Sequence, residues 1–359
     1  MTTTADLRLP LRPQLKPALR RVWRDGETLQ LGVEPPHAVM LTGLGPAELQ
    51  LLDLLDGSRE TGAVVEHAAS LGLDAAAARA LLERLARAGL LDDGGTDARS
   101  DQRDQQRLQP DRLSLSLRHR NAGAADMVLA RRRRAAVTVH GAGRVGATVG
   151  TLLGAAGVGR ISCVDERSVR TADLSPAGIC DDVTASRGAA AAARISRCAP
   201  STLTHTAPFA SPTLVIVAPA ASVAPPETLA TVRRHPHVLV AIRETTAAVG
   251  PFVVPGRTPC IRCLELSRSD RDRQWPSIAA QLIAAGRAPE PCDVALATLA
   301  ASLVTLHALA WIDSDRTDLP PSAGGVLELG LSDIRLRRRS LAAHPACGCG
   351  VLGTGDTVP

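Results

Sequence analysis

Apolar residues recur at two spacings along this chain, and the spacings divide it into three regions. The first region, residues 13–93, has short runs of period two followed by three segments of helical spacing. Residues 94–112 are polar, have neither period and end near a proline. From residue 113 onward, apolar strand-like runs alternate with helical segments. The pattern predicts a small α+β domain, a flexible linker and a larger α/β domain.

The first region predicts three short strands and three helices. In "RRVWRDGETLQLG", Asp25-Gly26 lies between two apolar runs and indicates a hairpin, and "HAVMLTGL" follows as a third strand. The third helix, "DAAAARALLERLARAGLLDD", is expected to begin after Asp74 as N-cap and to end near Gly89. This order in about eighty residues is typical of a winged-helix-like domain.

The third region predicts a mostly parallel sheet wrapped by helices. Strands are expected at "AAVTVHG", "RISCVDE", "TLVIVAPA", "HVLVAIRE" and "AVGPFVVPG", with helices between several of them. The run Val294–Ile312 is nearly long enough to span a bilayer, but His307 and its small residues favour a buried helix. "GGVLELGLSDIRLRRRSL" returns to period two and predicts a closing strand pair.

Composition narrows the possible chemistry. The formal net charge of +5 over 359 residues is mild and does not by itself indicate a nucleic-acid partner. Lys16 is the only lysine, so a phosphate clamp in the third region would have to use arginine. The N-terminus lacks the apolar run of a signal peptide, which favours a cytoplasmic location. In a reducing compartment, the eight cysteines favour metal ligands and core residues over disulfides.

A glycine motif marks the start of the third region. Gly141, Gly143 and Gly146 form G-x-G-x-x-G after an apolar strand and before a helix, and Arg144 lies inside the turn. The amides at such a helix N-terminus attract phosphates. The next strand ends in Asp165, where a carboxylate would accept hydrogen bonds from ribose hydroxyls. The context predicts nucleotide-binding geometry, with a merely structural glycine turn as the alternative.

The cysteines supply a second signal. "PCIRC" places Cys260 and Cys263 in C-x-x-C spacing, and "HPACGCG" places Cys347 and Cys349 in C-x-C spacing. Four thiolates suit a structural zinc site, closed to catalysis, that would join the two segments. A redox C-x-x-C and unrelated thiols are the alternatives. His344 is expected to be a neighbour of this site and not a ligand.

Together these residues resemble the ThiF/MoeB-type, ubiquitin-activating-like superfamily over roughly residues 113–350. The resemblance implies a Rossmann-like domain, ATP binding, adenylation of the C-terminus of a small protein, a homodimer and a structural zinc. It also implies that Asp165 is the aspartate that holds the ribose.

Several positions depart from the pattern of that superfamily. In "ADLSPAGI", Asp173 stands at the usual asparagine, Pro176 at the arginine and Ala177 at the glutamine. Arg187 replaces the usual lysine, and Ala218, Pro219 and Ala220 stand where a magnesium-binding aspartate is usual. Adenylation needs cations and a metal at the transferring phosphate, so efficient adenylation is not expected. Arg187 and Cys292 are the remaining candidate catalytic residues.

A narrower resemblance accounts for these losses. "VGPFVVPGRTPCIRCLELSRSDRDRQWP", Val249 to Pro276, is similar to the adenylation-defective homologues of azole-forming (TOMM) peptide-modification systems, which resemble the cyclodehydratase partner protein. Those proteins join a PqqD-like winged helix, which binds a precursor's leader peptide, to a ThiF-like domain. The resemblance implies a leader-binding scaffold that works with an ATP-using YcaO-type partner.

Three other functions compete with this scaffold. An active adenylyltransferase would need Arg187, or arginines such as Arg131 to Arg134, to replace the lost groups. A nicotinamide-dependent oxidoreductase shares the glycine turn but lacks a convincing acid or base, His140 included. A DNA-binding regulator would use arginines of the third helix, which Asp74 and Glu83 offset. Arg131 to Arg134 are otherwise expected to be a solvated entry to the first strand.

Overall fold

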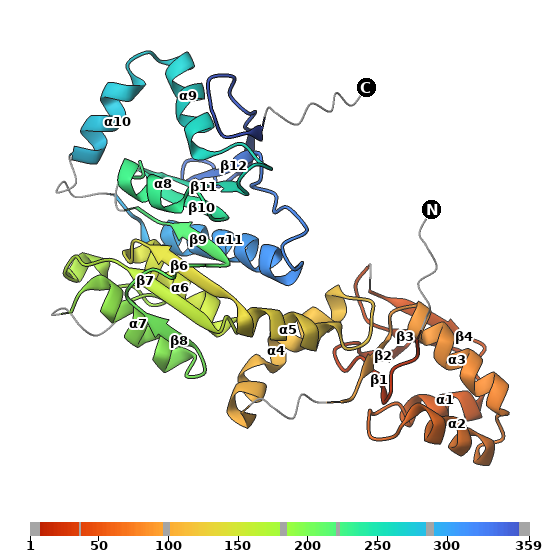
Figure 1. Ribbon diagram of the computed structural model, residues 1–359. Coiled ribbons are helices and arrows are strands. Elements are labelled where there is room, and N and C mark those ends of the chain that lie inside the picture. Colours follow the sequence, from red (N-terminus) through yellow and green to blue (C-terminus); the bar gives the residue numbers. More distant parts are fainter. Residues whose placement is uncertain are drawn as a thin grey trace. The chain divides into compact units, whose positions relative to one another are not determined.

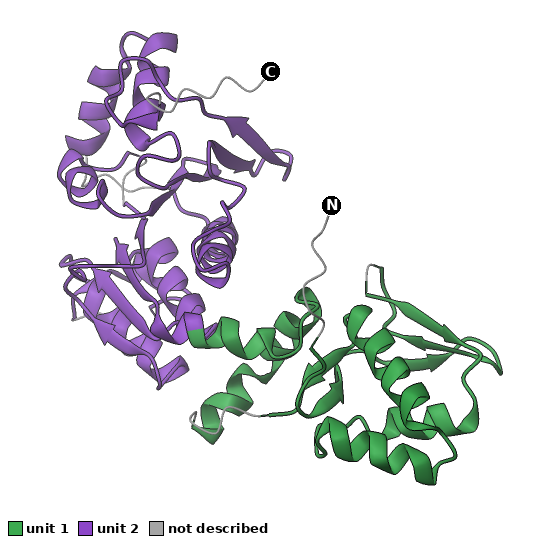
Figure 2. Ribbon diagram, turned by 45° about the vertical axis from the view of Figure 1, so that its right-hand side comes forward, with its two compact units in different colours: residues 1–130 green, residues 131–359 purple. Residues whose placement is uncertain are grey.

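The computed structural model describes residues 8–35, 37–95, 101–179, 185–219, 223–284 and 291–351. The chain divides into two compact units, residues 1–130 and 131–359 (Figure 2). Ala220 and Cys180 lie outside the described residues.

The first unit contains two small sheets and a group of helices (Figure 1). Its strands are β1 (Pro13–Leu15), β2 (Arg21–Trp23), β3 (Thr28–Leu31), β4 (Val39–Thr42) and β5 (Leu91–Asp93). Its helices are α1 (Pro46–Asp53), α2 (Thr61–Ser70), α3 (Ala75–Arg87), α4 (Gln102–Arg118) and α5 (Ala124–Arg134), the last running past residue 130. Strands β2, β3 and β4 form an antiparallel sheet in that order, and β1 pairs with β5.

Local sequence signals account for most of this unit. The Asp25 carboxylate accepts hydrogen bonds from the amides of Glu27 and Thr28 at 2.9 and 2.7 Å, which fixes the turn of the predicted hairpin. The Asp74 side chain caps α3 at the amide of Ala77, as predicted. The β1–β5 pair was not predicted, because three-residue strands far apart in sequence leave no periodic signal.

Helix α4 occupies most of the segment that was predicted to be a flexible linker. Leu108 and Leu115, seven residues apart, lie on one face and pack with residues of α5 in a small buried cluster. The Lys16 ammonium is buried and donates to the carbonyls of Ser116 and His119, at 2.5 and 2.6 Å, at the C-terminal end of α4. Leu108 is the only leucine within the predicted linker, which was too weak a signal to predict this helix. The domain boundaries at 93 and 113 stay a prediction.

The second unit is built on one eight-stranded sheet of order β13-β12-β11-β10-β9-β6-β7-β8. Its strands are β6 (Ala136–His140), β7 (Arg160–Val164), β8 (Leu203–His205), β9 (Leu214–Val217), β10 (His237–Arg243), β11 (Thr246–Val253), β12 (Gly325–Gly330) and β13 (Leu336–Ser340). Strands β8, β7, β6, β9 and β10 are parallel, whereas β11, β12 and β13 join as antiparallel neighbours. The direction of chain progression reverses between β6 and β9, where open α/β sheets bind ligands.

Helices cover both faces of this sheet (Figure 1). They are α6 (Arg144–Ala155), α7 (Arg187–Cys198), α8 (Pro226–Val232), α9 (Ile261–Arg271), α10 (Trp275–Ala284) and α11 (Val294–Asp313), with a short 3-10 turn, Thr171–Asp173. Alternate residues of β9 show the two faces, since Leu214 and Ile216 pack with α6, α7 and α11, whereas Val215 and Val217 pack with α8.

Helix α11 is a core helix, as predicted. By length and composition it could cross a membrane, and among the described residues it is the one helix that could. However, 61% of its most apolar 18-residue stretch is buried, and the helix packs against α6, β10 and β11.

The four consecutive arginines before β6 are not all solvated as predicted, since Arg134 is exposed but Arg132 is buried. They form the last turn of α5, where cations interact favourably with the helix dipole. Arg132 is buried, and its guanidinium makes two bonds of 2.8 Å to the Asp313 carboxylate at the end of α11. Arg131 donates to the Asp313 carbonyl. Arg131 and Arg132 therefore connect the last turn of α5 to the end of α11, near the first residue of β6.

Candidate functional site

The glycine turn joins β6 to α6 at the point where the strand order reverses. Gly141 has φ +93°, and a Cβ there would lie 2.0 Å from the Ala218 carbonyl oxygen at the end of β9. A Cβ at Gly146 would lie 1.8 Å from the carbonyl oxygen of Gly141. At Gly143, in contrast, a Cβ would meet nothing within 4 Å. Gly141 and Gly146 are thus required by packing, and Gly143 leaves open space at the N-terminus of α6.

This difference predicts that two similar substitutions change the stability of the protein by unequal amounts. Gly146→Ala is expected to lower the free energy of unfolding by about 1–3 kcal/mol, because backbone must move to accept the methyl group. Gly143→Ala is expected to change it by less than about 1 kcal/mol, the typical effect at an N-cap. Urea unfolding of both variants measures the difference. Equal losses would show that the turn is not packed as described.

Asp165 lies at the end of β7, beside the turn, and its carboxylate is engaged within the chain. It accepts a hydrogen bond from the Ala142 amide at 2.9 Å and a pair of bonds from Arg167 at 2.8 and 2.7 Å. Burial opposes ionisation of Asp165, but these bonds outweigh burial and lower the pKa of the carboxyl group. The contact with Arg167 was not predicted, although Arg167 stands only two residues from Asp165.

Arg187, a candidate for phosphate contact or catalysis, is also engaged. It is the first residue of α7, its side chain is 3% exposed, and it makes bonds of 2.7 and 2.6 Å to the Asp173 carboxylate. Its other terminal nitrogen lies 4.0 Å from Asp165. The residue that replaces the expected asparagine therefore pairs with the residue that replaces the expected lysine.

Arg144 and Cys292 meet at the same end of the sheet. The Arg144 guanidinium donates to the carbonyls of Ala172 and Cys292, both at 2.7 Å. Arg144 thus ties α6 to the segments before Asp173 and before α11. Cys292 is half-buried and contributes its backbone to this contact.

Arg131 to Arg134 lie at the opposite end of β6 from the glycine turn. The five residues of that strand extend for roughly 16 Å. Together with the contacts of Arg131 and Arg132 to Asp313, this distance argues against their replacing cations at the turn.

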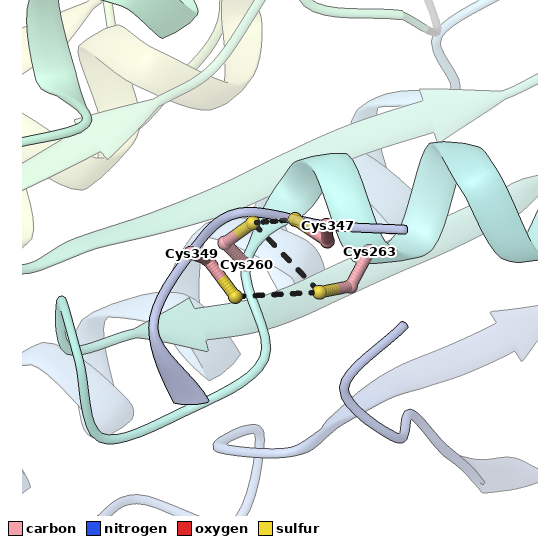
Figure 3. Close-up of side chains that lie close together, drawn as sticks. All are labelled: Cys260, Cys263, Cys347 and Cys349. Carbon is pink, nitrogen blue, oxygen red and sulfur yellow. Dashed lines mark hydrogen bonds between the residues drawn. The ribbon is translucent and has the colours of Figure 1, made fainter. Parts of the chain in front are cut away.

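The four predicted cysteine ligands form one cluster (Figure 3). Cys260 and Cys263 come from the start of α9, and Cys347 and Cys349 follow β13. The Sγ atoms lie within 4.8 Å of one another, and three contacts measure 3.5, 3.7 and 3.9 Å. Four sulfur atoms bound tetrahedrally at ~2.3 Å from zinc stand roughly 3.8 Å apart. The donor set and its spacing therefore suit a four-coordinate metal ion.

The surroundings of the cluster also suit a metal. Burial raises the pKa of the Cys260 and Cys347 thiols, since a thiolate loses hydration there, and a coordinated cation offsets this loss. The backbone amide of His344 donates to Cys263 Sγ at 3.4 Å, while its ring contacts Asp270. His344 is thus a neighbour of the cluster, as predicted, and lies outside the group of four potential ligands.

Comparison with known proteins identifies the fold. No protein-family model matches the sequence, and no curated protein matches it. Among solved structures, E. coli MccB with MccA-N7isoASN has a TM-score of 0.67 at 14% identity, over 94% of this chain and 99% of that chain. E. coli MccB with ATP has a TM-score of 0.67 at 15% identity over the same shares. Selenomethionine-labelled PaaA has a TM-score of 0.58 at 18% identity, over 73% of this chain and 91% of that chain. The predicted Rossmann-like, ThiF-type α/β fold is therefore confirmed.

Proposed function

We propose that this protein is a peptide-binding scaffold of a ribosomal-peptide modification system, with an adenylation site that has lost its activity. The observation that carries the proposal is the β2-β3-β4 sheet of the first unit, which has exposed apolar side chains on both outer strands. Structures of MccB, described as a microcin C7 biosynthetic enzyme, contain the MccA peptide. Their similarity in fold supports a peptide as the partner here.

Both outer strands of this sheet offer backbone groups to an added strand. Arg24 and Arg20 bond to β3 through the Thr28 carbonyl and the Gly32 amide, so the backbone of Trp23, between them, faces away from β3. The same alternation turns the backbone of Met40 away from β3 on β4. An extended peptide can bind such an edge by main-chain hydrogen bonds.

Exposed apolar side chains flank these edges. Val22 and Trp23 on β2 are 43% and 54% exposed, and Met40 on β4 is 60% exposed. Isolated apolar residues on a surface are common, but three on the outer strands of one short sheet favour a binding surface. A winged-helix domain of the PqqD-like type would use this sheet for the leader of a precursor peptide.

A substitution pair at each edge tests the proposal. Trp23→Pro and Met40→Pro each remove one outward-facing amide while leaving the bonds to β3 intact, and Trp23→Thr and Met40→Thr are the matched controls. The probe is a fluorescent peptide selected for binding to the full chain from a displayed library of random peptides. We expect one proline variant to weaken its affinity by about tenfold or more, since a backbone bond and local geometry are lost.

The matched threonine variant should retain a larger part of the affinity. If the selected peptides bind both proline variants as tightly as wild type, strand addition at this sheet is wrong. If selection yields no peptide at all, the scaffold proposal fails as a whole.

The second unit supports loss of adenylation. Asp165 and Arg187, two of the charged residues expected at ATP, are paired with Arg167 and Asp173. Ala218 and Pro219 offer no carboxylate for magnesium. The alternative, an active ATP-dependent adenylyltransferase, is favoured by the open space at Gly143 and by the fold shared with MccB, of which one structure contains ATP. We expect no ATP–pyrophosphate exchange above background, with or without peptide; exchange would establish the alternative.

Further partners follow from the proposal. Zinc would be held by Cys260, Cys263, Cys347 and Cys349, and its chemistry there would be structural, since four protein ligands leave no open position. A YcaO-type enzyme would carry out the reaction in the cytoplasm, and the chain would act as a homodimer. Neither membrane nor nucleic acid is a proposed partner; on α3, for example, Arg87 pairs with Glu83 at 2.9 Å.

A further inference from the structure

A pocket of about 390 Å³ lies in the second unit, outside the glycine turn. Helix α9 forms one wall, and the end of β10, strands β12 and β13 and the residues after β13 form the rest. The lining residues are Arg243, Leu264, Ser267, Arg268, Arg271, Val326, Glu328, Arg339, Ser340, Leu341 and Ala342. A volume of this size suits a small molecule or one residue of a peptide.

The pocket is strongly basic. Leu264, Ser267, Arg268 and Arg271 have the spacing of one helix face, so α9 presents two guanidinium groups beside a leucine and a hydroxyl. The sheet adds Arg243 and Arg339. The four arginines face two carboxylates, Glu328 in the pocket and Glu265, which binds Arg268 at 2.8 Å.

Arg243 is a weakly compensated cation of this pocket. Its nearest carboxylate is Glu328, with one contact of 3.5 Å, and Glu328 also binds Arg339. Its Nε is buried and has no hydrogen-bond partner among the described residues. Burial, together with the charge of Arg268, lowers the pKa of Arg243 to about 10. A half-buried cation in this state is stabilised by an anion that reaches it.

We propose that this pocket binds a carboxylate carried on a short apolar group. The guanidinium groups match a carboxylate in geometry, and Leu264, Val326, Leu341 and Ala342 form an apolar wall for the attached group. A phosphate fits less well, because Arg268 and Arg271 lie in the last turns of α9, where the helix dipole disfavours a multiply charged anion. The site is distinct from the proposed peptide-binding sheet and does not depend on it.

Calorimetric titration of the full chain with N-acetyl-L-leucine tests the proposal. N-acetyl-L-leucinamide is the uncharged match, and inorganic phosphate is the anion without an apolar group. We expect the acid to bind and the other two to bind at least about tenfold more weakly, the usual effect of one charge-assisted bond.

Two variants separate the pocket from general surface charge. Arg271→Gln removes a lining cation whose described hydrogen bond is to the Ser267 carbonyl of its own helix. This variant should bind N-acetyl-L-leucine about tenfold more weakly. Arg262→Gln changes an exposed arginine of α9 outside the pocket and should leave the affinity for N-acetyl-L-leucine unchanged. Thermal unfolding of both variants verifies that they are folded.

A tetrapeptide ending in leucine, with a carboxylate or an amide at its C-terminus, identifies the source of the ligand. If the carboxylate form binds at least as well as the small acid, the ligand is a peptide terminus; if the pocket excludes it, the ligand is a small acid. Either result supports the pocket. The proposal is overturned if N-acetyl-L-leucine does not bind, if its amide binds equally well, or if Arg262→Gln weakens it as much as Arg271→Gln.

Discussion

Cys263→Ser is expected to abolish binding of one zinc ion per chain and to lower the free energy of unfolding by more than about 4 kcal/mol. Cys263 is buried with no exposed surface, and its sulfur contacts those of Cys260 and Cys349. A structural zinc adds its binding free energy to folding, which amounts to roughly 10 kcal/mol or more in small zinc domains. Metal analysis and thermal unfolding measure the two effects.

The size of this effect follows from the position of the cluster. The two cysteine pairs are separated by α9, α10, α11, β12 and β13, so the metal would close a long loop of the second unit. Cys198→Ser, at the half-buried C-terminal end of α7, is the matched control and should change neither zinc content nor stability appreciably. Wild-type protein with well under one equivalent of zinc, or a Cys263→Ser variant that retains the metal, would contradict the zinc assignment.

Arg187→Met is expected to destabilise the second unit by about 3–5 kcal/mol, because it leaves the Asp173 carboxylate buried without its cation. The double variant Arg187→Met with Asp173→Asn should recover most of this loss. Asparagine carries no charge, and its side-chain oxygen can still accept the hydrogen bond that the Arg170 amide now donates to Asp173. Urea unfolding of the single and double variants measures the recovery.

Arg337→Met provides the comparison for this pair. Arg337 binds Asp333 on the surface, where both side chains are accessible to water, so its loss should change stability little. If Arg187→Met is as harmless as Arg337→Met, the buried pair does not hold α7 to the segment around Asp173. If the double variant is no more stable than the single one, the loss comes from packing and not from an unpaired charge.

The sequence by itself determined the features that depend on neighbouring residues or on strong spacing. The Asp25 turn, the Asp74 cap, the glycine turn and the period of the strands each arise from interactions within a few residues. The cysteine cluster joins distant segments, but two closely spaced cysteine pairs are typical of a metal site, so their meeting could be predicted. Helix α4 was missed because its apolar face consists of few residues.

Only the tertiary structure decided what the charged residues do. The pattern of the chain shows where Asp165, Asp173, Arg187 and Arg132 stand but not their partners. An arginine side chain reaches across several residues, and its partner is whichever carboxylate the fold brings near. Burial makes the loss of a partner destabilising, since a charge removed from water must be paired. The basic pocket at Arg243 could not be predicted from the sequence either, because its walls come from segments that become neighbours only when the sheet forms.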